Sequence, residues 1–115
     1  MPVTAHINVF IKDNEVPWEP AGDGVNRKVM AWDDRLMLVR VEFTNGSIGA
    51  LHQHHHSQIT HVESGSFEVQ ISGEKKVLGP GDVYIVPPHA IHGCVCLQAG
   101  VLIDVFSPMR EDFVK

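Results

Sequence analysis

The sequence has few cysteines, no long apolar run and no excess of basic residues, and each absence excludes a class of protein. Two cysteines in 115 residues cannot supply the disulfide framework of a small secreted domain. No stretch approaches the roughly 18 apolar residues of a membrane-spanning helix, so we expect no membrane partner. The chain has 9 Lys and Arg against 14 Asp and Glu, and this acidic balance argues against a nucleic-acid partner.

The amino terminus gives no sign of export. Residues 1–6 lack the basic region and apolar run of a secretory signal peptide, and we expect a cytoplasmic protein. Cys94 and Cys96 lie two residues apart on a predicted strand, at the outer edge of disulfide reach. We interpret them as small buried residues, with a redox pair or a soft-metal site as the alternative.

Short β-forming segments fill most of the chain, and no long segment shows helical periodicity. Turn sequences such as Asn45-Gly46 and Gly79-Pro80-Gly81-Asp82 separate them. The predicted strands are residues 29–32, 35–43, 66–71, 76–78, 83–86, 91–97 and 101–106. Strands of this length with turns every 8–12 residues or so are typical of a sandwich or barrel. We predict an all-β fold with a closed or nearly closed barrel, which removes exposed strand edges.

The length indicates one domain, and three regions divide it. Residues 1–25 form an amino-terminal arm and loop, residues 26–106 the barrel and residues 107–115 a carboxy-terminal tail. Within the arm, residues 6–11 read as a strand that pairs with a second subunit, and residues 18–24 read as a loop.

Three histidines and one amide make a candidate metal site. His52 and His54 are two residues apart on an extended segment, where alternating side chains project from the same face. Their Cα atoms would be roughly 6–7 Å apart, which suits two imidazoles that bind one ion. Gln58 and His92 complete a plausible set of ligands for a divalent metal.

The histidine run leaves a question of register. His56 and Gln58 share the parity of His52 and His54, but a straight strand cannot aim all four at one ion. The chain must bend after His54, and Ser57 is the expected position. His56 then either supports the ligands or lines a substrate pocket. We interpret the remaining histidines as solvent-facing or packing residues: His6, His55, His61 and His89.

Two spaced motifs resemble those of the cupin superfamily. The first motif is matched by five residues, with glutamine where most cupins have glutamate: Gly46, His52, His54, Gln58 and Gly65. The second is matched by Gly81, Pro87 and His92, with His89 in place of the usual glycine and Cys96 where asparagine is common. This resemblance implies a cupin β-barrel, that is, a double-stranded β-helix or jelly roll.

A closer resemblance covers nearly the whole chain. The sequence is similar to the KdgF-type cupins of pectin and alginate breakdown, which convert unsaturated uronate monosaccharides to linear keto forms. The resemblance rests on residues 16–18, 27–29, 48–50, 52–54, 56–59 and 92–97 and, most of all, on residues 104–113 near the carboxy terminus. In that family a glutamine ligand matches Gln58, whereas His55 stands where proline is common. The resemblance implies a small anionic sugar as substrate and a homodimer.

Three residues near the carboxy terminus are candidates for catalysis and binding. Asp104 lies within the apolar run 101–106, and a buried carboxylate needs a partner. It is either a core residue satisfied by hydrogen bonds or, as the resemblance implies, a general base. The guanidinium of Arg110 suits a substrate carboxylate, and Phe106 offers a flat wall for a sugar ring or is plain core.

The predicted ligand set favours one type of chemistry. Three imidazoles and an amide are neutral, so a bound divalent ion keeps its full charge as a Lewis acid and anion binder. We expect one such ion, with Zn, Ni, Mn and Fe as the candidates. The resulting hypothesis is a ring-opening, ketonising enzyme of isomerase type. A small iron-dependent dioxygenase and a non-catalytic sugar-binding cupin are the alternatives.

Overall fold

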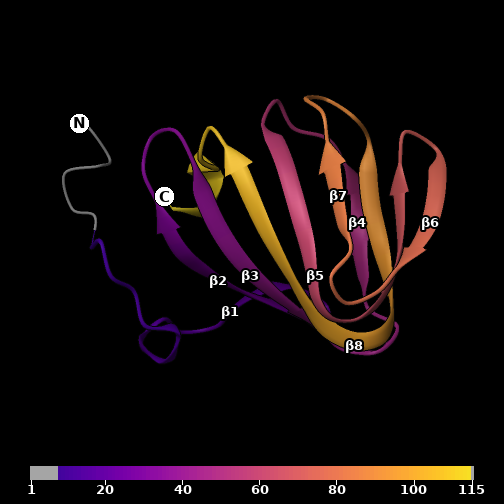
Figure 1. Cartoon of the computed structure of the whole chain (residues 1–115), viewed down its shortest axis with the longest axis horizontal. Helices are drawn as coiled ribbons and strands as arrows, with labels where there is room; N and C mark the ends of the chain where they lie inside the picture. The colour runs from indigo at the N-terminus through magenta and orange to yellow at the C-terminus, as the bar shows by residue number, and fades with distance from the viewer. Residues whose placement is uncertain (1–7, 115) are drawn as a thin grey trace.

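The chain is built almost wholly from β-strands, as the computed structural model in Figure 1 shows for residues 8–114. The strands are β1 (Glu19–Gly22), β2 (Val25–Trp32), β3 (Met37–Phe43), β4 (Ile48–His52), β5 (Ser57–Ile71), β6 (Glu74–Leu78), β7 (Val83–Val86) and β8 (His92–Ser107). The described residues also form two short 3-10 helices, η2 (Asp13–Glu15) and η3 (Glu111–Phe113). None of the helices in the described part of the chain has the length and apolar character needed to cross a membrane.

Two long bent strands, β5 and β8, form the middle of the barrel. The first half of β5 pairs with the second half of β8, and the second half of β5 with the first half of β8. Both strands bend sharply where Gly65 and Gly100 meet, and a side chain on either glycine would collide with the backbone of the other strand. Strands β1, β2, β3 and β7 extend one half of the sheet, and β4 and β6 extend the other. Figure 1 shows how β8 curves from one half into the other.

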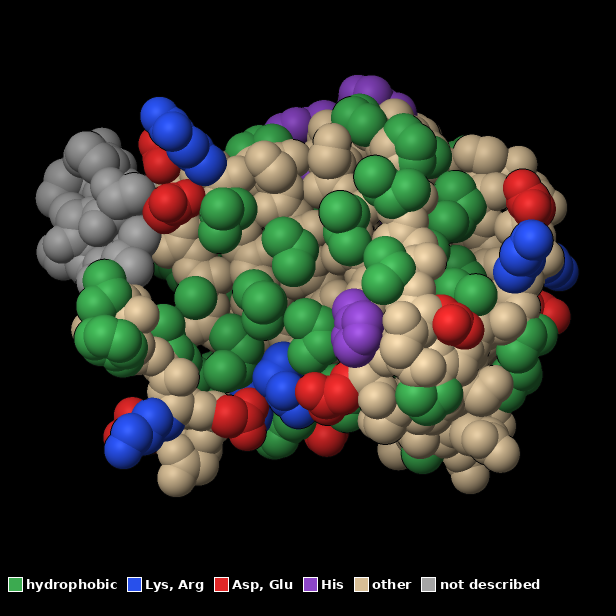
Figure 2. All heavy atoms as spheres, in the orientation of Figure 1, with side chains coloured by type: hydrophobic (Ala, Val, Ile, Leu, Met, Phe, Trp, Pro, Cys, Tyr) green, Lys and Arg blue, Asp and Glu red, His purple; other side chains and the backbone are tan. Residues whose placement is uncertain are grey.

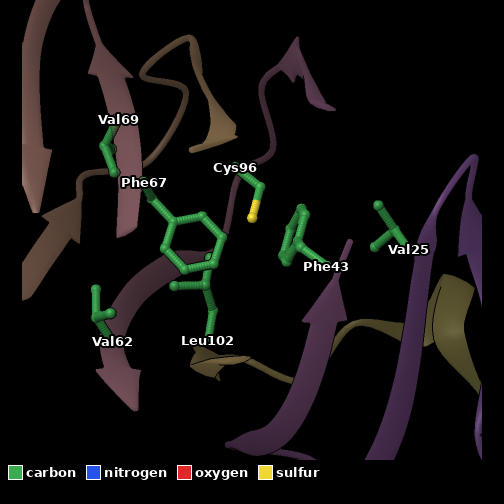
Figure 3. Packing of buried hydrophobic residues seen from close by; sticks show 7 residues of the cluster. All are labelled: Val25, Phe43, Val62, Phe67, Val69, Cys96 and Leu102. Atoms are coloured by element: carbon green, nitrogen blue, oxygen red, sulfur yellow. The ribbon is translucent and has the colours of Figure 1, made fainter. Parts of the chain in front are cut away.

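The space between the two halves is filled by an apolar core. The rings of Phe43 and Phe67 meet edge to face with centroids 5.2 Å apart. Figure 3 shows their neighbours from both halves of the sheet, Val25, Val62, Val69, Cys96 and Leu102. A second buried cluster of Met37, Val39 and Phe106 lies toward the carboxy-terminal tail. Inward-facing apolar residues therefore fill the space between the two halves of the sheet and leave the ends of the strands to carry polar groups.

Several predicted boundaries are wrong in an informative way. The predicted loop 18–24 contains β1, which pairs with β2 through Glu19 and Arg27. The two predicted strands 91–97 and 101–106 are one strand, β8, because tertiary pairing with β5 carries the chain through Gly100. Of the predicted arm strand, only residues 8–11 lie within the described part of the chain, and they form no strand.

The outer face of the sheet departs from the usual polar pattern of a half-buried strand. Ile59 on β5 is the register partner of Ile85 on β7 and of Val105 on β8, and all three side chains are exposed. Figure 2 shows apolar side chains gathered over this part of the surface.

The predicted homodimer stays a prediction, since the first residues of the proposed arm lie outside the described residues.

His89 occupies a left-handed backbone conformation, with φ of 67°, which explains why cupins commonly have glycine there. Its N–H donates to the carbonyl oxygen of His54 at 2.7 Å. Because this conformation costs a residue with a Cβ about 1 kcal/mol, we expect His89→Gly to raise the free energy of unfolding by about 0.5 kcal/mol after the entropic cost of glycine. Urea denaturation measures the change. Ala90→Gly, at an ordinary φ, should lower the same free energy, and equal losses in both variants would contradict the explanation.

Candidate metal centre and cavity

Three histidine rings converge at one end of the barrel, where β4 ends and β8 begins. His52 closes β4 and is the register partner of His92 on β8, whereas His54 lies in the turn after β4. Donor nitrogens of the three rings lie within 4.8 Å of one another. The ring centroids are 4.3 Å apart for His52 and His92 and 4.9 Å apart for His54 and His92. These residues form a cluster that could hold a metal ion.

The backbone determines which nitrogen of each ring faces the cluster. Each Nδ1–H donates to a carbonyl oxygen two residues away along the chain, at 2.8 Å for His52, 3.1 Å for His54 and 2.9 Å for His92. In a neutral ring this leaves Nε2 with a lone pair, as in histidines that bind metal ions. Within residues 8–114 the buried Nε2 of His92 has no hydrogen-bond partner, which a metal ion would satisfy.

Burial keeps two of these rings neutral. It lowers the pKa of His92 to about 4 and lowers the pKa of His54 below its ordinary value. A histidine must be unprotonated to bind a metal ion, so burial prepares both rings for this role.

Gln58, at the start of β5, presents its carbonyl oxygen to the cluster. Its Oε1 lies 3.0 Å from Nε2 of His54, so two lone-pair atoms face each other at a distance that a shared cation would explain. The other end of the amide is fixed, because Nε2 of Gln58 donates to Oγ1 of Thr60 at 2.8 Å and to Oδ1 of Asp104 at 3.4 Å. The donor set, three imidazoles and one amide oxygen, fits a divalent metal ion.

Asp104 projects from β8 beside this amide. It is the register partner of Thr60 on β5, whose hydroxyl donates to Oδ1 of Asp104 at 2.6 Å. Burial raises the pKa of Asp104 to about 6, although the Thr60 hydrogen bond and the positive charge of Arg110 oppose the rise. A carboxyl group with this pKa is poised to accept or release a proton near neutral pH.

Arg110 lies over the ring of Phe106 and is held from one side. Its Nε and Nη2 donate to the carboxylate of Asp112 at 3.1 and 2.9 Å, and its guanidinium carbon lies 5.1 Å from the ring centroid of Phe106 and 4.3 Å from that of Phe113. These contacts fix the plane of the guanidinium group. Asp112 occupies the edge formed by Nε and Nη2. Within residues 8–114 Nη1 makes no hydrogen bond, so the edge formed by Nη1 and Nη2 is available to an anionic ligand.

One cavity joins these groups. Its volume is about 520 Å³, and its lining includes His52, Gln58, His92, Asp104, Phe106 and Arg110. This volume suits a small organic molecule. Tyr84 also lines the cavity, and burial raises the pKa of its hydroxyl well above its ordinary value, so Tyr84 is a neutral hydrogen-bonding group there.

Residues 39–106 match the Cupin domain family. The chain belongs to the cupin family. A curated relative, the "Pectin degradation protein KdgF" of Dickeya dadantii (strain 3937), is 52% identical over 107 residues, which are 91% of this chain and 97% of that protein. This cupin is therefore KdgF-like, as its sequence predicts.

Two solved structures share both fold and sequence with this cupin. The KdgF from Halomonas sp. has a TM-score of 0.88 and 42% identity, and the match covers 92% of this chain and 98% of that one. An RmlC-like cupin from Shewanella frigidimarina NCIMB 400 has a TM-score of 0.90 and 42% identity, covering 92% and 96%. The polyketide cyclase RemF of Streptomyces resistomycificus, at 21% identity and a TM-score of 0.74, shares the fold.

The structure of this cupin brings most of the predicted site residues together. His56 is the exception, because its Nε2 faces the carbonyl oxygen of Met109 at 3.2 Å and the residue is in neither the cavity lining nor the cluster of His52, His54 and His92. This placement favours a role for His56 in supporting the site and not in lining a substrate pocket. His54 projects from the turn after β4 and not from the predicted strand, and the chain bends at His55 and His56, just before Ser57.

Three residues of the site were missed in the sequence: Thr60, Tyr84 and Asp112. Thr60 carried a usable signal, because it follows Gln58 by two residues and alternation puts both on one face of β5. Tyr84 comes from β7, and its approach to the cavity depends on the pairing of β7 with β5. Asp112 lies two residues after Arg110 in the short 3-10 helix η3, where no periodicity predicts which side chains meet.

Proposed function

We propose that this cupin is a metal-dependent enzyme that converts 4,5-unsaturated uronate monosaccharides, derived from pectin or alginate, from the cyclic to the linear keto form. The observation that carries the proposal is the sharing of one cavity by a histidine cluster, a carboxyl group of raised pKa and an arginine. The names of the KdgF relatives support it.

Substrate binding falls to Arg110 and Phe106. The free edge of the guanidinium binds the sugar carboxylate through two parallel hydrogen bonds. Phe106 lies beneath Arg110 and is only 2% exposed, so it acts mainly by fixing the guanidinium that meets the sugar. Asp112 keeps Arg110 in place before substrate arrives, so little side-chain entropy is lost on binding.

Asp104 performs the proton transfer. In its ionised form it takes the proton of the anomeric hydroxyl, the bond from the anomeric carbon to the ring oxygen breaks, and an aldehyde and an enolate form. The enolate takes a proton at C4 and becomes the 5-keto acid, so the reaction is an isomerisation without net gain or loss of atoms or electrons. Thr60 holds Oδ1 of Asp104 at 2.6 Å and leaves Oδ2 for this transfer.

A divalent ion held by His52, His54, His92 and Gln58 would supply positive charge near the oxygen that becomes negative. All four donors are neutral, which preserves that charge and favours Lewis-acid chemistry over the redox chemistry of a dioxygenase. The identity of the ion stays open among Zn, Ni, Mn and Fe.

The test follows the ultraviolet absorbance of the conjugated double bond in unsaturated monouronates, with one preparation from pectin and one from alginate. We expect the protein to accelerate the loss of absorbance beyond the spontaneous rate, and a chelator to abolish the acceleration until metal is restored. The faster substrate identifies the pathway. The rate should be equal with and without oxygen. A metal-loaded protein that gives no acceleration would overturn the proposal, and dependence on oxygen would favour the dioxygenase.

A further inference from the structure

A second group of metal-binding side chains lies outside the cavity, between the histidine run and the carboxy-terminal tail. His55 and His56 follow the turn that carries His54, and Glu111 begins η3. One donor atom from each of the three residues lies within 4.8 Å of the others. The carboxylate of Glu111 divides its oxygens between the two rings, Oε1 at 3.9 Å from Nε2 of His55 and Oε2 at 3.5 Å from Nε2 of His56.

These distances suit a shared cation better than direct hydrogen bonds. A charge-assisted hydrogen bond between nitrogen and oxygen is roughly 2.7–2.9 Å long, shorter than either contact. Two ligands about 2.1 Å from one zinc ion at the tetrahedral angle are separated by roughly 3.4 Å. The two contacts of Glu111 lie nearer to this second value, and His55 and Glu111 are the side chains that rotate to bring the donors onto one ion. Nε2 of His56 also faces the carbonyl oxygen of Met109 at 3.2 Å, so this nitrogen must release its proton when the ion binds.

The chemistry and accessibility of the group also fit a metal ion. Two imidazoles and one carboxylate are a donor set that binds zinc in other proteins. The ring of His56 is almost fully buried and packed at one orientation, with centroids 5.3 Å apart from His54 and 3.9 Å apart from His55. His55 and Glu111 are exposed, so an ion can enter from solvent without passing through the cavity.

We propose that His55, His56 and Glu111 form a second, weaker site for a divalent transition-metal ion. An ion there joins the turn after β4 to η3 and so clamps the tail, which carries Arg110 immediately before Glu111, onto the barrel. The site has two neutral ligands and one anionic ligand, and it exchanges with solvent because two of its three ligands are exposed. It is separate from the cluster of His52, His54 and His92 and shares no ligand with it.

Isothermal titration of the metal-free protein with Zn²⁺ tests the proposal. We expect two classes of site in the wild type, and loss of the weaker class alone in His55→Ala and in Glu111→Gln. His52→Ala should lose or weaken the tighter class and keep the weaker one. His61→Ala is the matched control, since His61 is an exposed histidine on the outer face of β5, and it should keep both classes.

Hydrogen exchange in the tail supplies a second readout that is independent of catalysis. Filling the weaker site should slow exchange of the amides of residues 111–114 in the wild type, because bound metal stabilises the clamped state, and should leave it unchanged in Glu111→Gln. A wild type with only one class of site would overturn the proposal. So would a His61→Ala variant that loses the weaker class as His55→Ala does, because it would show adventitious binding to surface histidines. Neither readout depends on uronate turnover, so failure here and failure of the proposed function are distinguishable.

Discussion

Replacing Asp104 with asparagine should lower kcat by about a thousandfold or more while the protein keeps its metal ion. Asparagine preserves the size of the side chain and still accepts the hydrogen bond from Thr60 through Oδ1, but it cannot take a proton. General base catalysis commonly contributes roughly 10²–10⁴-fold, and here the same group serves the ring opening on which the later steps depend. The measurement is the loss of uronate absorbance, together with the metal content of each preparation.

The control for Asp104→Asn is Glu74→Gln, which makes the same chemical change at an exposed position on β6 and should leave kcat unchanged. If Asp104→Asn also loses the metal ion, the carboxylate has a structural role at the metal site and is not shown to be the base. Full activity with bound metal would remove Asp104 from the mechanism altogether.

The raised pKa of Asp104 also predicts opposite effects on activity and on stability. Folding raises the pKa of this carboxyl group from its ordinary value of 3.8 to about 6, so the ionised form is disfavoured in the folded state. Stability of the metal-free protein should therefore fall as pH rises from about 4 to about 6. Asp104→Asn removes this cost, and its melting temperature should exceed that of the wild type at pH values above 6 and match it at acidic pH.

The pH profile of the wild type follows from the same group. Because the base must be ionised, kcat/KM should fall as pH drops through about 6, or somewhat lower once a bound cation stabilises the carboxylate. Metal content measured at each pH separates protonation of Asp104 from loss of the ion. An acid limb that tracks metal loss would contradict the assignment of the limb to Asp104.

The β-fold and the histidine cluster that could hold a metal ion were predictable from sequence because they depend on short-range patterns. The spacing of His52 and His54, together with the later His92, is enough to indicate a metal-binding pattern. Turn residues and alternating apolar residues are equally local, and they predict most strands. The interpretation of Asp104 as a polar residue in an apolar strand needed no tertiary information, although its partner Thr60 did.

The errors lie where tertiary contacts override local preference. Gly100 reads as the end of a strand, yet β8 continues through it, because the glycine permits close approach to Gly65 on β5. Pro20 and Gly22 read as a loop, but β1 lies at an edge of the sheet, where proline is tolerated. The meeting of His55 and His56 with Glu111 joins residues more than 50 positions apart, and no periodicity in either segment predicts it.

Replacing Gln58 with glutamate should be the second most damaging change, even though most cupins carry glutamate at that position. Nε2 of Gln58 donates to Thr60 at 2.8 Å and to Asp104 at 3.4 Å, and in the variant a carboxylate oxygen takes the place of this donor. The single hydroxyl hydrogen of Thr60 can serve one of two carboxylates only. Two carboxyl groups this close share a proton, so the pKa of the pair rises.

We therefore expect Gln58→Glu to bind the divalent ion more tightly and yet to lose activity, on the order of a hundredfold at neutral pH. The acid limb of its kcat/KM profile should move up by about one pH unit or more, and activity should recover in part at alkaline pH. Gln70→Glu, on the same strand but outside the lining of the cavity, is the matched control and should behave as the wild type. Measured rates and Zn²⁺ affinities decide between two explanations of Gln58. If Gln58→Glu keeps wild-type activity and pH dependence, the neutral ligand is incidental. If the variant loses activity while its acid limb is unchanged, the loss comes from reduced charge on the metal ion and not from the pairing of residue 58 with Asp104.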